Sequence, residues 1–122
     1  MKLQLEQAAG RCVFTGYGAG YVEVNHARHE SPVLVVPELV QPWDVSAFSV
    51  LAPEHFSELL AHAPEIVLLG TGAMLRFPEP ALTRPLADAG VGLEVMDTRA
   101  ACRTFNILTS EGRRVLAAVF IE

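Results

Sequence analysis

Three short, unbroken aliphatic runs constrain the fold of this chain more than any other feature. They occupy residues 33–36, 66–69 and 115–121. A run that is apolar at every position must be covered on both faces, so each run predicts a strand near the middle of a sheet. None of them approaches the roughly 20 apolar residues that a membrane span requires. We therefore expect a central sheet and no membrane-spanning segment.

The segments before the second run are mostly β-like. Alternating apolar and polar residues predict antiparallel strands at residues 3–7, 12–17 and 21–25, separated by turns that include the glycines of residues 16–20. Residues 43–51 are mixed and also lean toward β structure. The first half is thus expected to supply hairpins.

Helices are predicted at residues 53–63, 83–89 and 98–110, where apolar side chains recur at helical spacing or turn signals frame the segment. Thr83 and Asp97 are the expected N-caps of the second and third helices. A further strand is expected at residues 93–96. The alternation of strands and helices in this half is typical of an α/β sheet with crossover connections.

Composition limits the classes of partner. With 122 residues, of which 51% are hydrophobic, residues 1–122 are expected to form one domain. A net charge of -5 argues against a nucleic-acid partner. The first residues lack a secretory signal pattern, so a cytoplasmic location is expected. Cys12 and Cys102, with no CxxC motif, are predicted to be free thiols.

One crevice collects the candidate site residues. If the strands before Gly70 and Asp97 are parallel, their carboxyl ends meet where open α/β sheets usually bind ligands. Arg99 and Arg103, four residues apart near a helix N-terminus, would suit an anion there. The structural alternative, which we prefer at this point, is that Asp97 caps the helix and pairs with Arg99. The candidate residues are Gly70, Thr71, Gly72, Arg76, Asp97, Thr98, Arg99, Cys102, Arg103 and Asn106.

No complete catalytic or metal-binding set is visible. Leu75 stands where a dinucleotide fingerprint needs its third glycine, so no cofactor is predicted. The neighbouring arginines would acidify the Cys102 thiol, but no histidine is placed to act as its base, and a buried structural cysteine is the preferred interpretation. The four histidines have no metal-binding spacing, so no metal site is predicted.

Four motifs in a fixed order carry a family resemblance. They are Ile-Val-Leu-Leu-Gly-Thr-Gly at residues 66–72, Gly-Leu-Glu-Val-Met-Asp-Thr at 92–98, Ala-Ala-Cys-Arg-Thr-Phe-Asn-Ile-Leu at 100–108 and Glu-Gly-Arg-Arg-Val-Leu-Ala-Ala at 111–118. The chain resembles a small family of uncharacterised bacterial and archaeal proteins. Their eukaryotic relatives include a mitochondrial respiratory complex I assembly factor and an adipogenesis-associated protein. The resemblance implies one three-layer α/β domain, with a central mixed sheet, flanking helices and an additional β-hairpin layer.

The resemblance implies no established catalytic activity and points to an interaction role. We therefore expect a non-enzymatic, assembly-factor-like module with a protein partner, linked to respiratory complex assembly. The alternative is a small-molecule or anion-binding enzyme that uses the crevice. A third hypothesis is self-association through apolar residues such as Trp43, Phe48 and Phe77.

Overall fold

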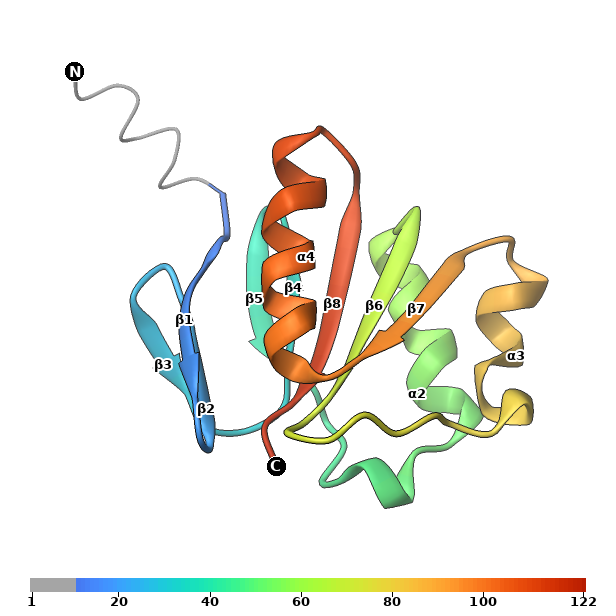
Figure 1. Ribbon diagram of the computed structural model, residues 1–122. Helices are drawn as coiled ribbons and strands as arrows, with labels where there is room; N and C mark the ends of the chain where they lie inside the picture. The colour runs from blue at the N-terminus through green and yellow to red at the C-terminus, as the bar shows by residue number, and fades with distance from the viewer. Residues whose placement is uncertain (1–10) are drawn as a thin grey trace.

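The computed structural model describes residues 11–122, which form two β-sheets and their covering helices (Figure 1). The smaller sheet is antiparallel and contains β1 (Phe14–Gly18), β2 (Tyr21–Val24) and β3 (Ala27–His29) in that order. It confirms the predicted strands at residues 12–17 and 21–25. The strand predicted at residues 3–7 and the first residues, which were considered for a secretory signal, lie outside the described residues.

The larger sheet has five strands. Their order is β5 (Leu39–Pro42), β4 (Val33–Val36), β8 (Val115–Phe120), β6 (Ile66–Thr71) and β7 (Gly92–Met96). The strand β6 runs parallel to β7 and β8, whereas β4 is antiparallel to β5 and β8, so the sheet is mixed. The three aliphatic runs are the three inner strands β4, β8 and β6, as predicted, and the partly exposed strands β5 and β7 form the edges.

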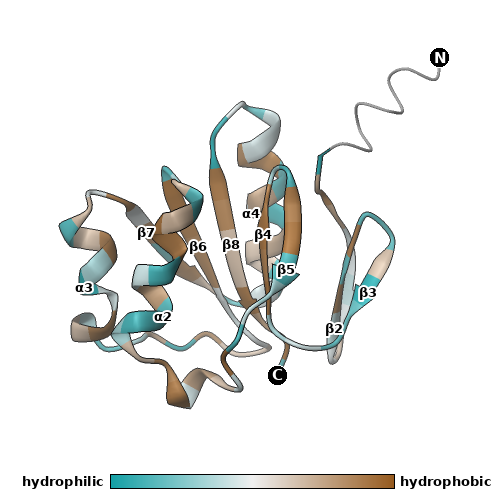
Figure 2. Ribbon diagram, turned by 180° about the vertical axis from the view of Figure 1, so that it is seen from behind, coloured by the Kyte–Doolittle hydropathy of each residue, from teal (hydrophilic) through white to brown (hydrophobic). Residues whose placement is uncertain are grey.

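Successive residues of the inner strands face two separate cores. Val35, Leu68 and Ala117 pack with α4 (Thr98–Ser110) and with the inward side chains of the smaller sheet. Their neighbours Val36 and Leu69 pack on the opposite side, beneath α2 (Pro53–Ser57), the short helix η2 (Glu58–His62) and α3 (Pro80–Asp88). Figure 2 shows the inner strands as the most hydrophobic part of the ribbon. The predicted three-layer architecture, with its added β layer, is confirmed.

The longest helix follows the prediction closely. The carboxylate of Asp97 accepts a hydrogen bond from the Ala100 N–H at 2.9 Å and so caps α4 at its first turn. The helix ends before Gly112, whose φ of 86° is readily reached only by glycine. No helix within residues 11–122 is long and apolar enough to span a membrane.

Two local predictions were wrong. Helix α3 begins at Pro80 rather than after Thr83, because proline at the first helical position loses no hydrogen bond. Thr83 is therefore not an N-cap, and its hydroxyl lies 3.3 Å from the carbonyl oxygen of Pro80.

Residues 43–51 form a loop and the short helix η1 (Phe48–Val50) rather than a strand. Their apolar side chains serve the core instead: the Trp43 ring lies 5.0 Å from that of Phe120 and 6.5 Å from that of Phe56. The edge strand next to β4 is instead β5, at residues 39–42, and it was not predicted.

Candidate functional site

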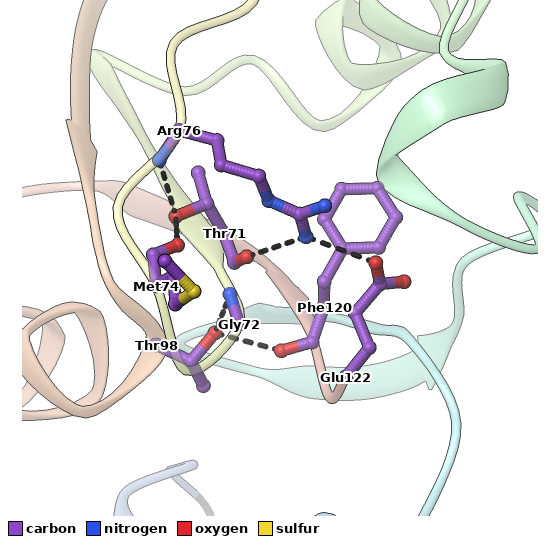
Figure 3. A network of polar contacts seen from close by, with 7 residues as sticks. All are labelled: Thr71, Gly72, Met74, Arg76, Thr98, Phe120 and Glu122. Atoms are coloured by element: carbon purple, nitrogen blue, oxygen red, sulfur yellow. Dashed lines mark hydrogen bonds and ion pairs between the residues drawn. The ribbon is translucent and has the colours of Figure 1, made fainter.

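A buried network joins the carboxyl ends of β6 and β8 to the start of α4 (Figure 3). The Thr98 hydroxyl donates to the carbonyl oxygen of Phe120 at 2.7 Å and accepts the Gly72 N–H at 2.8 Å. The Thr98 N–H donates in turn to the Gly72 carbonyl oxygen at 2.9 Å. The segments at residues 70–72 and 97–98 therefore do meet at one edge of the sheet, held together by the Thr98 hydroxyl and by backbone groups.

A second network fixes the loop of residues 72–79 that leaves β6. The Arg76 guanidinium donates from Nη2 to the Thr71 carbonyl oxygen and to the Glu122 carboxylate, both at 2.9 Å. The Thr71 hydroxyl donates to the Met74 carbonyl oxygen at 2.7 Å and accepts the Arg76 N–H at 3.2 Å. Figure 3 shows Arg76 reaching across the loop toward Glu122. Thr71 and Arg76 thus shape the loop.

The two glycines of this region are required by close packing. Gly72 has a φ of 95°, and a Cβ there would overlap the carbonyl oxygen of Glu122. A Cβ on Gly70 would lie 2.8 Å from a Val119 methyl and 3.0 Å from the Thr98 hydroxyl. Both positions bring α4 and the chain after β8 close to the end of β6.

The arginines of α4 lie beside the β1–β2 hairpin. Arg103 donates from Nη1 to the Tyr17 hydroxyl at 2.9 Å, and this hydrogen bond raises the Arg103 pKa. The guanidinium carbons of Arg99 and Arg103 lie 6.0 and 5.9 Å from the Tyr17 ring centroid. Among the ion pairs of residues 11–122 none joins Asp97 to Arg99, so the predicted pairing was wrong although the predicted cap was right.

Cys102 belongs to the core rather than to a reactive site. Its side chain is buried, and this burial raises the thiol pKa to about 12. The opposing effect of the Arg103 charge is smaller, so the acidified thiol considered from the sequence is not formed. Cys12 is also buried, and both thiols are free.

Asn106 connects α4 to the smaller sheet. Its side-chain oxygen accepts the Phe14 N–H at 2.9 Å, and its amide nitrogen donates to the Phe14 carbonyl oxygen at 2.8 Å. These two hydrogen bonds satisfy the backbone N–H and carbonyl groups of Phe14, as a neighbouring strand would. Asn106 therefore has a structural role, two turns away from the start of α4.

A hollow of about 270 Å³ opens beside the start of α4. It is lined by residues from four segments of the chain: Tyr17, Gly18, Ala19, Gly20, Tyr21, Gly72, Ala73, Thr98, Arg99, Ile121 and Glu122. Of the ten candidate residues, Gly72, Thr98 and Arg99 line it.

The hairpin side of this hollow was missed from the sequence. The Gly-Tyr-Gly-Ala-Gly-Tyr segment at residues 16–21 was interpreted only as the turn of a hairpin. Its two tyrosines were the available signal, because aromatic side chains are not needed to form a glycine-rich turn. Among residues 11–122 no three histidine, cysteine, aspartate or glutamate side chains are grouped to hold a metal ion.

The loop after β6 exposes three large apolar side chains. Met74, Leu75 and Phe77 are 72%, 52% and 70% exposed. The Arg76 guanidinium between them turns inward and lies 4.5 Å from the ring of Phe48 in η1. Trp43, grouped with Phe48 and Phe77 for self-association, is only 5% exposed because it packs on Phe56 and Phe120. Trp43 is therefore a core residue and offers no surface for association.

Comparison with known proteins identifies related sequences and structures. The family model described as "Protein of unknown function (DUF498/DUF598)" matches residues 14–120. The Bos taurus protein named NADH dehydrogenase (ubiquinone) 1 alpha subcomplex assembly factor 3 is 34% identical over 119 residues, which are 96% of this chain and 64% of that protein. The chain thus spans less than two thirds of the length of this relative.

Two solved bacterial structures share the fold. A crystal structure of a Bordetella parapertussis protein has a TM-score of 0.88 and 39% sequence identity, covering 93% of this chain and 98% of that one. A solution structure from Bordetella pertussis, described as an Mth938-like domain, has a TM-score of 0.77 and 35% identity, covering 89% and 85%. The architecture of this chain is therefore the Mth938-like fold.

Proposed function

The chain belongs to the DUF498/DUF598 family, and from this membership we propose that it is a protein-binding module with an assembly-factor-like role. Its proposed partner is a protein of the NADH dehydrogenase that the bovine relative is named for. The cytoplasmic location expected from the sequence stays a prediction. Nothing in the comparisons supports the enzyme alternative, and the buried, weakly acidic Cys102 thiol offers no nucleophile for one.

The observation that carries the proposal is the apolar loop, by which we mean Met74, Leu75 and Phe77. Each of these side chains is more than half exposed. Single exposed apolar residues are common on protein surfaces, but several within four positions of one loop mark a contact surface. Methionine and aromatic residues are also enriched at protein interfaces.

The backbone beneath the apolar loop is already ordered. The bonds from Thr71 to Met74, from Arg76 to Thr71 and from Arg76 to Glu122 hold it on both sides. Binding of a partner would therefore cost little additional backbone conformational entropy, and the main entropy cost would be the ordering of these side chains. Because 52–72% of each side chain is still exposed, its burial by a partner would contribute about 1–2 kcal/mol.

A genetic test separates this role from a purely structural one. In a strain that lacks the protein, we expect reduced NADH dehydrogenase assembly on native gels, restored by the wild-type chain. A Met74→Ser/Phe77→Ser double variant should fold but fail to restore assembly. Ile107→Ser is the matched control, because Ile107 is a 57% exposed apolar residue on α4. Full restoration by the double variant, or no assembly defect in the deletion strain, would contradict the proposal.

A further inference from the structure

The hollow beside α4 has two arginines next to it, in a chain whose net charge is -5. Arg99 lines it, and Arg103 is hydrogen-bonded to Tyr17 on its wall. Neither arginine forms an ion pair with a carboxylate of residues 11–122, whereas Arg28, Arg76, Arg113 and Arg114 each do. Two cations are thus held next to one cavity without an acidic partner among the described residues.

The carboxylates closest to the hollow are already engaged. Glu122, which lines it, accepts a charged hydrogen bond from Arg76 at 2.9 Å. Asp97 accepts the Ala100 N–H at 2.9 Å. Glu122 is thus paired with Arg76, whereas the charge of Asp97 still acts on Arg103 and helps to raise its pKa. The guanidinium of Arg99 is left as the charged donor at the rim.

The remaining walls suit a flat apolar group. The Tyr17 ring stands on the hairpin side, and Ala73 and Ile121, which follow β6 and β8, also line the hollow. Tyr21 lines it as well, but its ring is stacked against the Arg28 guanidinium, whose carbon lies 3.9 Å from the ring centroid. A volume of about 270 Å³ has room for a single ring with an acidic head. The hollow also lies beyond the carboxyl ends of the parallel strands β6 and β8, where α/β sheets commonly bind ligands.

We propose that this hollow binds a small organic anion, in which a carboxylate or phosphate on an apolar ring contacts Arg99 and the ring packs between Tyr17 and Ala73. Arg103 adds positive charge beside Tyr17, and its hydrogen bond to the Tyr17 hydroxyl fixes the orientation of the Tyr17 ring. None of the three side chains of the apolar loop lines this hollow, although Ala73 directly precedes Met74 in the chain. The proposed anion site does not require the protein partner proposed above.

The direct test is a titration of the ¹⁵N-labelled full chain followed by amide chemical shifts. The probes are phenyl phosphate, benzoate, inorganic phosphate and neutral benzyl alcohol. Phenyl phosphate or benzoate should give saturable shifts at Gly18, Gly20 and Ala73, and the stronger of the two identifies the preferred acidic head. Inorganic phosphate and benzyl alcohol should each bind at least about tenfold more weakly, because each lacks one half of the recognised group.

Variants distinguish anion binding in the hollow from nonspecific binding to positive charge elsewhere on the surface. Arg99→Gln should weaken binding by about tenfold or more, since a hydrogen bond to a charged group is lost. Ala73→Trp should remove the saturable shifts by filling the cavity from its wall. Arg84→Gln, an exposed arginine on α3, is the matched control and should leave binding unchanged.

The absence of saturable shifts near the hollow would overturn the inference. So would equal affinity for benzyl alcohol or inorganic phosphate, or equal weakening by Arg99→Gln and Arg84→Gln. None of these results bears on the apolar loop, so the proposed protein-binding role would stand or fall by its own test.

Discussion

Replacement of Thr98 by valine tests whether the buried network at the sheet edge stabilises the fold. Valine has nearly the same shape as threonine, so the substitution removes the hydroxyl without opening a cavity. It deprives the buried Gly72 N–H of its acceptor and the Phe120 carbonyl oxygen of a donor, now at 2.8 and 2.7 Å. A buried polar group left without its partner costs about 1–3 kcal/mol, so we expect a loss of about 3 kcal/mol for the two groups together.

Urea unfolding followed by circular dichroism measures this loss, with the m-value expected to stay constant. For a chain of this length, a loss of about 3 kcal/mol corresponds to a fall of roughly 12 °C in Tm. Thr98→Ser is the matched control: it keeps the hydroxyl and loses one methyl group, which is worth about 0.8 kcal/mol. If Thr98→Val is no less stable than Thr98→Ser, the Thr98 hydroxyl does not stabilise the fold.

Three further predictions concern other contacts. Asn106→Leu should cost about 2 kcal/mol and speed hydrogen exchange at the Phe14 amide, because two bonds between α4 and β1 are lost. The Cys102 thiol has a pKa of about 12 against an ordinary 9.0, so the unfolded chain releases this proton first and stability should fall as pH rises from 9 toward 12. Urea midpoints across that range should decline less in Cys102→Ala. Gly72→Ala should destabilise by about 2 kcal/mol or more, whereas Gly90→Ala, which also has positive φ but open space around it, should cost about 1 kcal/mol in the same assay.

Much of the fold was predictable because its strongest signals are local. The inner strands contain unbroken aliphatic runs, and α4 is preceded by a capping aspartate and followed by a glycine with positive φ. The start of α3 was predicted wrongly because two nearby residues both signal a helix start. Pro80 starts α3 three residues before Thr83, and either residue is a reasonable helix start when tertiary contacts are unknown.

The site was predictable only in part. Gly72 and Thr98 were correctly expected at one edge of the sheet, because parallel strands bring their carboxyl ends together. The tyrosines of the hairpin could not be placed there from spacing, since they belong to another sheet whose position depends on contacts such as that between Asn106 and Phe14. Cys102 was also ambiguous from sequence, because burial outweighs the neighbouring arginine only once the helix is packed.

The strand β8 lies between β4 and β6 although it follows both of them in the chain. While the protein is being synthesised, β4 with β5 and β6 with β7 can form only two separate pairs, each with an open inner edge. They become one sheet when residues 115–120 enter between them, so these last strand residues decide when folding is completed. A chain interrupted before Val115 would keep both edges open, and such unpaired strands readily join those of other molecules.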